Sequence, residues 1–281
     1  MAGTDHVFSF YGVLTPQADT QWVRVFPVEM RLEPAHAPSI DAVVTSTDQQ
    51  TGARQTWRDT VLTVFDGGPD AVNGYFFWAP LTPGYGNAYR IDVERSDGVA
   101  AHATAFVPTR SELEVQPPVS TQTASARVLI RGTASHFISV GLRYDVKFGF
   151  GEGTEISLQR AYEQRIDPVD GGYLVVIDLG RAQNEIESLL RANLIFDASF
   201  GVELLGLTLH LLVTDPAWDP PGDVLTFDPN VLVEPNQMRN VTGGFGFVGA
   251  GYRLEQTWLP DEQTLRNAGF QIHQDTTAAA F

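Results

Sequence analysis

The chain has 281 residues, of which 43% are hydrophobic and 19% are charged, and it carries no cysteine and a formal net charge of −16. Such an acidic surface repels the phosphates of nucleic acids, so we expect no nucleic-acid partner. Without cysteine there is no disulfide, thiolate nucleophile or thiolate metal ligand, and no apolar run reaches the ~18 residues of a membrane span. The composition is that of a globular protein with room for two domains.

The first part of the chain consists of short segments rich in aromatic and β-branched residues. They are separated by turn-forming stretches such as "DGGPDAVNG" (66–74), and no helical periodicity occurs before residue 110. Regularly spaced short strands with turn signals are typical of a β-sandwich. The sequence therefore predicts an all-β domain over residues 1–110, with strands at 7–14, 21–28, 42–47, 55–65, 75–78, 88–94 and 99–107.

A boundary follows in "PTRSELEVQPPVSTQTAS" (108–125), where two prolines and a Ser/Thr run predict a linker over 111–125. Beyond it, strand patterns recur, but residues 181–193 have a helical period that places Ala182, Ile186, Leu189 and Leu190 on one face. A second short helix is predicted over 261–268, between Pro260 and Gly269. Residues 126–281 are thus predicted to form a β-sandwich or barrel-like domain carrying one helix on its sheet and a short helix near its end.

The segment "VTGGFGFVGAGY" (241–252) contains the spacing G-x-G-x-x-G at Gly244, Gly246 and Gly249. A dinucleotide site needs a buried strand before this motif, a helix starting at its last glycine and an acidic residue further on. The following Ala250-Gly251 is a poor helix start, and Pro260 limits any helix that forms. The motif therefore predicts a strand and no cofactor, with Phe245 and Phe247 buried on one face and the glycines allowing close approach on the other.

Two acidic loops are candidates either for calcium ligands or for simple turns. One contains Asp66, Asp70 and Asn73; the other, "DPAWDPPGDVLTFDP" (215–229), surrounds a tryptophan with carboxylates. Calcium takes oxygen ligands from such loops, but neither has the spacing of the known calcium-binding loop. Tryptophans fill cores or line carbohydrate and peptide grooves. The one least readily assigned to a core defines a candidate binding surface of Trp218, Asp215, Asp219 and Asp223.

No catalytic constellation emerges from the titratable residues. The six histidines are scattered, the single lysine Lys147 is not in an S-x-x-K motif, and there is no G-x-S-x-G. Glycoside hydrolysis needs a pair of carboxylates, and nothing in the sequence selects two of the 34 acidic residues. These observations favour a protein that is not an enzyme.

The order of features resembles an uncharacterised family of β-rich outer-envelope lipoproteins of Bacteroidota-type bacteria, often encoded near TonB-dependent receptors. The resemblance lies in "FSFYGVLTPQADTQWVRVFPV", "GYFFWAPLTPGYGNAYRIDVERSDG", "AFVPTRSELEV" and "TFDPNVLVEPNQMRNVTGGFGFVGAGY". It implies that residues 1–110 form an immunoglobulin-like sandwich. It also implies an exported protein of the cell envelope or extracellular space, whose leader and lipid-bearing cysteine are missing from this chain.

Together these features predict a non-enzymatic envelope protein that binds a partner protein or a glycan. Two alternatives stay open: a hydrolase acting on glycans or peptides, and a structural subunit of a surface assembly. A hydrolase requires a cleft with two convergent carboxylates, and an assembly subunit requires an exposed edge strand. The sequence predicts no oligomeric state.

Overall fold

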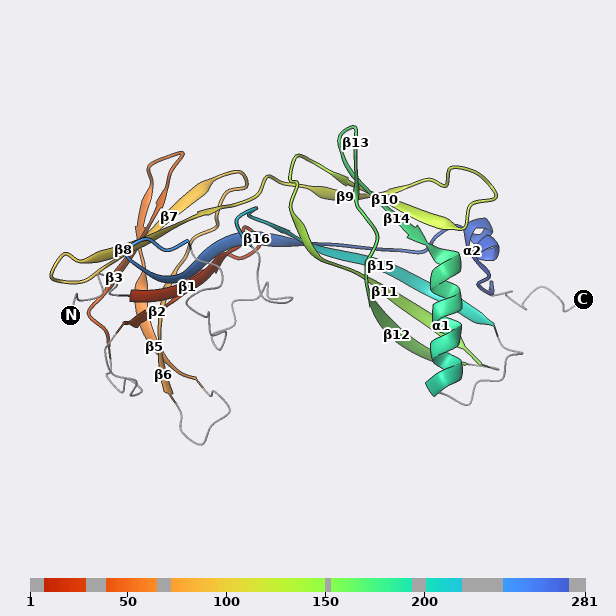
Figure 1. Ribbon diagram of the computed structural model, residues 1–281, viewed down its shortest axis with the longest axis horizontal. Helices are drawn as coiled ribbons and strands as arrows, with labels where there is room; N and C mark the ends of the chain where they lie inside the picture. The colour runs from red at the N-terminus through yellow and green to blue at the C-terminus, as the bar shows by residue number, and fades with distance from the viewer. Residues whose placement is uncertain are drawn as a thin grey trace, which may run out of the picture. The chain divides into compact units, whose positions relative to one another are not determined.

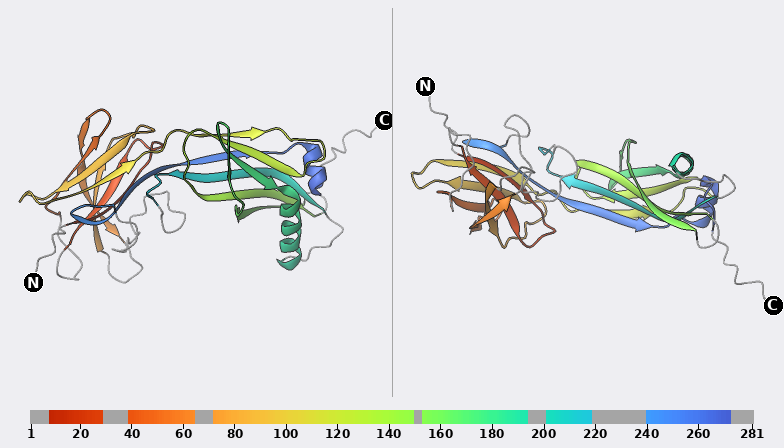
Figure 2. Two further views of the ribbon diagram at one scale, coloured as in Figure 1. Left: turned by 45° about the horizontal axis from the view of Figure 1, so that its top comes forward. Right: turned by 90° about the horizontal axis from the view of Figure 1, so that it is seen from below.

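The computed structural model describes residues 8–28, 39–64, 72–149, 153–193, 201–218 and 240–272. The chain forms two compact units. Unit 1 comprises Met1–Arg110, Ala134–Ile138 and Leu212–Arg253, and unit 2 comprises Ser111–Thr133, Ser139–Leu211 and Leu254–Phe281. The described residues are mostly in strands, with two helices (Figures 1 and 2). The predicted all-β class is confirmed.

Unit 1 contains strands of two sheets. The first is the β16–β1–β2–β6–β5 part of an eight-stranded sheet, and the second is the four-stranded sheet β4–β3–β7–β8. Their bounds are β1 Phe8–Leu14, β2 Gln21–Pro27, β3 Val43–Asp48, β4 Arg54–Thr56, β5 Arg58–Val64, β6 Val72–Ala79, β7 Ala88–Glu94, β8 Ala100–Phe106 and β16 Gly244–Trp258.

The two sheets of unit 1 enclose one hydrophobic core. Alternate residues point inward, so Val23, Val25 and Phe77 of the first sheet share a buried cluster with Ile91 and Val93 of the second. The orders of neighbouring strands, β1–β2–β6–β5 and β4–β3–β7–β8, correspond to the A-B-E-D and C′-C-F-G sheets of an immunoglobulin-like sandwich. The predicted sandwich is confirmed, with β16 as an added strand.

The glycine motif lies in β16, which pairs in parallel with β1 so that Gly246 is opposite Phe10. Gly246 has φ 104°, and a Cβ added there would overlap the carbonyl oxygen of Phe10. The predicted strand and the close backbone approach are therefore confirmed. Phe247 is buried as predicted, whereas Phe245 on the same face is only half-buried.

Unit 2 contains the four-stranded sheet β13–β14–β10–β9 and the β12–β11–β15–β16 part of the eight-stranded sheet. The bounds are β9 Glu112–Gln116, β10 Ser125–Arg131, β11 Phe137–Phe148, β12 Thr154–Ala161, β13 Asp167–Val169, β14 Gly172–Asp178 and β15 Val202–Thr214, with helices α1 Leu179–Asn193 and α2 Glu262–Ala268. Both predicted helices are present, the longer one over residues 179–193 and the short one over residues 262–268. Helix α1 contacts α2 and β10.

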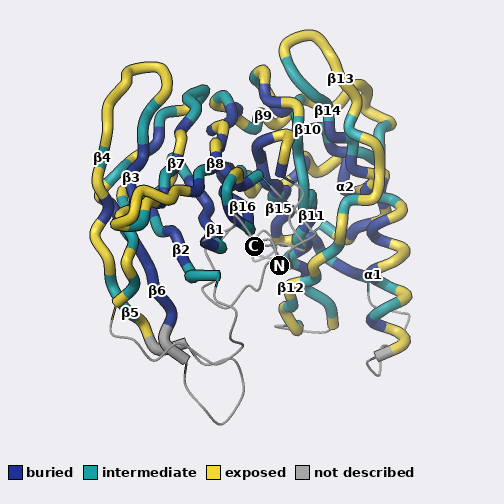
Figure 3. The backbone as a smooth tube through the Cα atoms, turned by 60° about the vertical axis from the view of Figure 1, so that its left-hand side comes forward, coloured by how far each residue is buried: buried dark blue, intermediate teal, exposed yellow. Residues whose placement is uncertain are grey.

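Helix α1 follows directly on β14. The Oδ1 of Asp178 accepts a hydrogen bond of 2.9 Å from the backbone N–H of Arg181, which caps the start of the helix. Ala182, Ile186 and Leu190 are buried and the opposite face is exposed, as the alternation along α1 in Figure 3 shows. The amphipathic pattern predicted for residues 181–193 is therefore what packs this helix onto unit 2.

The predicted domain limits need correction in two places. Residues 111–125 are not a linker, because they contain β9, in which Val115 pairs with Val128 of β10. Residues 134–138 and 212–253, assigned to the second domain, belong to unit 1. Proline and Ser/Thr content marks turns, but it does not reveal that β16 pairs with the strand that opens the chain.

Candidate ligand-binding site

Trp218 does not form a binding surface. Its side chain is fully buried in unit 1, with its ring centroid 6.1 Å from that of Phe247. A Cβ on Gly249 would lie 2.9 Å from Cδ2 of Trp218, and one on Gly251 would lie 3.1 Å from Cζ3. The prediction for Trp218 is thus corrected: two glycines of β16 leave the space that the indole fills.

The carboxylate of Asp215 stabilises a turn and does not face a ligand site. It is 8% exposed, and its Oδ2 and Oδ1 accept hydrogen bonds from the backbone N–H groups of Phe106 (2.8 Å) and Ala217 (2.9 Å). Asp219 and Asp223 lie outside the described residues, as do Asp66 and Asp70 of the other acidic loop. Across the described ranges, no cluster of three or more His, Asp or Glu side chains is arranged to hold a metal ion.

The tryptophans of the first two sheets also serve packing. Trp57 is buried and its Nε1 donates to the hydroxyl of Ser46 at 2.9 Å. Trp22 and Trp78 are half-buried neighbours with centroids 6.1 Å apart, and the guanidinium of Arg58 lies 5.0 Å from the centroid of Trp78. Their contacts with one another stabilise the β2–β6–β5 side of the sandwich.

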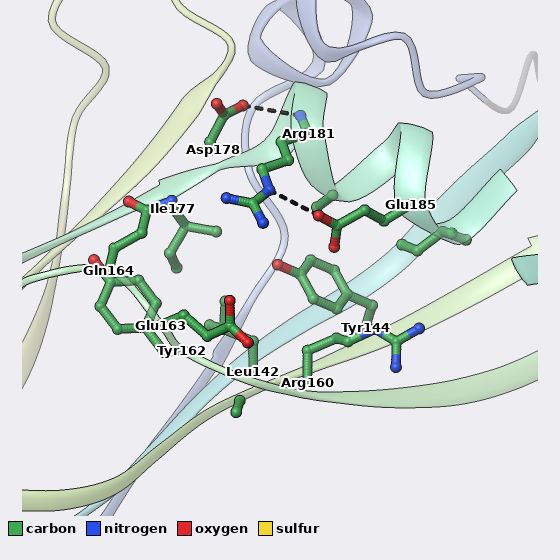
Figure 4. Close-up of a pocket in the computed structure, with 13 residues that line it drawn as sticks. Leu142, Tyr144, Arg160, Tyr162, Glu163, Gln164, Ile177, Asp178, Arg181 and Glu185 are labelled. Atoms are coloured by element: carbon green, nitrogen blue, oxygen red, sulfur yellow. Dashed lines mark hydrogen bonds and ion pairs between the residues drawn. The ribbon is translucent and has the colours of Figure 1, made fainter. Parts of the chain in front are cut away.

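A polar cavity of about 250 Å³ lies in unit 2 between α1 and strands β11, β12 and β14 (Figure 4). We call it the α1 pocket. Its apolar floor includes Leu142, Ile177 and Ile186, and its polar groups are Tyr144, Arg160, Tyr162, Glu163, Gln164, Asp178, Arg181 and Glu185.

Local periodicity explains how the pocket is built. Leu142 and Tyr144 alternate onto one face of β11, and Arg160 of β12 pairs with Leu142 and therefore shares that face. On α1, Arg181 and Glu185 are four residues apart and lie side by side on the helix. Tertiary packing brings these two surfaces opposite each other.

Tyr144 is the central side chain of the pocket. It is only 3% exposed, yet its hydroxyl opens into the cavity and makes no hydrogen bond within the described residues. Burial raises the pKa of Tyr144, and the negative charges of Glu185 and Asp178 raise it further against the opposing effect of Arg160. The hydroxyl is therefore neutral at physiological pH and can both donate and accept a hydrogen bond.

Tyr162 contributes a ring whose hydroxyl is already used by the fold. Its Oη donates to the carbonyl oxygen of Val176 at 3.0 Å and accepts from the backbone N–H of Val176 at 3.2 Å. Burial raises the pKa of Tyr162, with Asp167 adding to the shift and the bond from Val176 opposing it. The two tyrosines of the pocket thus differ in function. The hydroxyl of Tyr162 is bonded to the backbone of β14, and the hydroxyl of Tyr144 is available to a ligand.

The charged groups of the pocket also divide into two kinds. Nε of Arg181 donates to Oε1 of Glu185 at 2.7 Å, and this bond, with the charge of Glu185, raises the pKa of Arg181. Arg160 and Glu163, in contrast, form no hydrogen bond or ion pair with any described residue. Figure 4 shows the hydroxyl of Tyr144, the guanidinium of Arg181 and the carboxylate of Glu163 facing a common space.

No motif in the sequence indicates this pocket. Its residues come from four neighbouring segments between Leu142 and Ile186, and each matches an ordinary pattern: an inward tyrosine on an alternating strand and an i, i+4 ion pair on a helix. The feature of the sequence that could have indicated it is the alternation along β11, which places Tyr144, an aromatic residue with a polar hydroxyl, on a buried face.

Comparison with known proteins does not identify a family for this chain. No protein-family model and no curated protein matches the chain. A solved structure with detectable similarity is the crystal structure of chicken CNTN1 FN1–FN3 domains, at 10% identity and a TM-score of 0.23. The match covers 73% of this chain and 56% of that one, so the chain spans little more than half of its length. A TM-score this low supports no conclusion about function.

The helices that the structure describes do not have the features of a membrane span. Neither α1 nor α2, the two helices of the described part of the chain, is long and apolar enough to cross a bilayer. The strand order and the pocket together define a two-unit all-β protein with an immunoglobulin-like sandwich and a polar cavity beside a helix.

Proposed function

We propose that the α1 pocket binds a neutral, hydroxyl-rich ligand, a sugar unit of a glycan, and that the protein is a glycan-binding protein without hydrolytic activity. One observation carries the proposal: the hydroxyl of Tyr144 belongs to a side chain that is 3% exposed, is unpartnered among the described residues, and opens into a polar cavity. The cell envelope as the setting rests on the family resemblance of the sequence alone.

The chemistry of the pocket favours a neutral polar ligand. The three carboxylates of Glu163, Asp178 and Glu185 outnumber the two guanidiniums of Arg160 and Arg181, and the whole chain has a net charge of −16, so an anion is disfavoured. An apolar ligand would strip water from polar groups without replacing their hydrogen bonds. A sugar hydroxyl both donates and accepts, so it can satisfy a hydroxyl, a guanidinium and a carboxylate in turn.

The carboxylates favour binding over hydrolysis. Asp178 accepts a hydrogen bond from the first turn of α1, and Glu185 is bound to Arg181. A glycosidase needs two carboxylates, one acting as an acid and the other as a nucleophile or base. With two of the three engaged in the fold, Glu163 is left without a second carboxylate of equal freedom.

The experiment is a screen on an array of neutral and acidic oligosaccharides, followed by calorimetric titration of the neutral glycan that gives the strongest signal. Tyr144→Phe removes one hydroxyl and keeps the ring. Because a hydrogen bond contributes about 0.5–1.5 kcal/mol, we expect affinity to fall by roughly 2- to 13-fold.

Tyr162→Phe is the matched control. It keeps a ring in the pocket wall and breaks the two bonds to Val176, so we expect lower thermal stability and unchanged affinity. The proposal fails if no neutral glycan binds, or if Tyr144→Phe binds the glycan as tightly as the unaltered protein. Release of reducing ends that stops in Glu163→Gln would favour the hydrolase instead.

A further inference from the structure

A second hollow of about 580 Å³ adjoins the α1 pocket and runs along the same helix. It shares Arg160, Arg181 and Glu185 with the pocket and is lined further along by Asn184, Ser188 and Leu189. We call it the α1 groove. Because both hollows are lined by Arg181 and Glu185, they adjoin at this ion pair, and a ligand in the pocket can extend from there into the groove.

The exposed side of α1 presents a polar row to the groove. Arg181, Asn184 and Ser188 are spaced at i, i+3 and i+7, which places them on one face over about 10 Å of helix at 1.5 Å per residue. This row is therefore longer than one sugar ring.

The groups in this row retain capacity for a ligand. Nδ2 of Asn184 donates to the carbonyl oxygen of Gly180 at 2.8 Å, and the hydroxyl of Ser188 donates to the backbone carbonyl oxygen of Asn184 at 2.8 Å. In both of these bonds the side chain is the donor. The amide Oδ1 of Asn184 and the lone pairs of the Ser188 hydroxyl therefore remain available to accept hydrogen bonds from a ligand. Leu189, which is half-buried, adds an apolar contact beside them. Acceptors next to an aliphatic side chain suit the hydroxyls and the carbon-bound hydrogens of a pyranose.

We propose that the ligand is a neutral oligosaccharide of at least two linked units, one in the α1 pocket and the next in the α1 groove. This inference rests on the proposed function and extends it to the size of the ligand. The pocket groups around Tyr144 hold the first unit, and Asn184 and Ser188 bind the second. Specificity for a chain over a single sugar then comes from α1 alone.

The test is calorimetric titration with glucose, galactose, mannose and N-acetylglucosamine and with their linked di- and trisaccharides. We expect the preferred disaccharide to bind at least about fivefold more tightly than its monosaccharide, since two added hydrogen bonds contribute about 1–3 kcal/mol. The double variant Asn184→Ala/Ser188→Ala is expected to lose that gain and to keep the monosaccharide affinity. Gln263→Ala removes an exposed amide from α2 that lines neither hollow, and should change nothing.

The outcomes separate the two proposals. Equal affinity for the monosaccharide and the disaccharide, with both weakened by Tyr144→Phe, overturns the inference and leaves the proposed function in place. A gain with length that survives in the double variant also overturns it. If no sugar of the series binds, the proposed function and the inference fail together.

Discussion

Replacement of Gly246 by alanine is expected to destabilise unit 1 severely. Gly246 has φ 104° in β16, directly opposite Phe10 of the parallel neighbour β1. An added Cβ would overlap the carbonyl oxygen of Phe10, which is backbone and cannot turn aside as a side chain can. Relief therefore requires β16 to move away from β1, at the cost of ladder hydrogen bonds.

The magnitude follows from two contributions. A residue with a Cβ loses about 1–2 kcal/mol in a left-handed conformation. If the displacement breaks two backbone hydrogen bonds, at about 0.5–1.5 kcal/mol each, it adds roughly 1–3 kcal/mol. The sum, roughly 2–5 kcal/mol, is a large share of the 5–15 kcal/mol that typically stabilises a domain.

Gly52→Ala provides a matched control in the same unit. Gly52 also has a positive φ, 74°, but nothing lies within 4 Å of an added Cβ. It should therefore cost only the conformational part, about 1–2 kcal/mol. The difference between the two variants measures the close approach of β16 to β1.

Urea unfolding followed by tryptophan fluorescence measures this difference. Four of the five tryptophans, Trp22, Trp57, Trp78 and Trp218, lie in unit 1, so the signal reports mainly on that unit. The midpoint multiplied by the slope gives the free energy of unfolding. If Gly246→Ala costs no more than Gly52→Ala, the glycines of the motif do not serve strand approach, and the reasoning is refuted.

Two further predictions concern pH and the second helix. Burial raises the pKa of Tyr144 above its ordinary value of 10.0, so the unfolded chain releases that proton first. Stability is then fully present below pH 10 and falls above it by up to about 1.4 kcal/mol per pH unit, a slope in urea midpoints that Tyr144→Phe should reduce. Asp261 caps α2 by accepting hydrogen bonds from the hydroxyl (2.6 Å) and the backbone N–H (3.0 Å) of Thr264. Asp261→Ala should cost about 0.5–2 kcal/mol and speed amide exchange in α2; unchanged exchange would contradict this.

Local patterns in the sequence were sufficient for most elements of both units, but not for β9, whose segment was predicted to be a linker. Alternating residues predicted the strands, the period of residues 181–193 predicted α1, and Pro260 with Gly269 predicted α2. Long-range pairing was not predictable in this way. Residues 212–253 belong to unit 1 rather than to the predicted second domain, because β16 pairs with β1. The same strand supplies Gly249 and Gly251, whose missing side chains let Trp218 become a core residue.

The α1 pocket shows a different limit of sequence reasoning. Tyr144 and Tyr162 are the same residue type on neighbouring segments, and composition cannot tell them apart. The difference lies in the backbone of Val176, which forms two hydrogen bonds with the hydroxyl of Tyr162 and none with the hydroxyl of Tyr144. The hydroxyl of Tyr144 lines the cavity, where water or a ligand can complete its hydrogen bonds. The hydroxyl of Tyr144 is therefore the central ligand contact of the proposed function, because three of the five charged groups around it are already engaged: Arg181 with Glu185, and Asp178 with a backbone N–H.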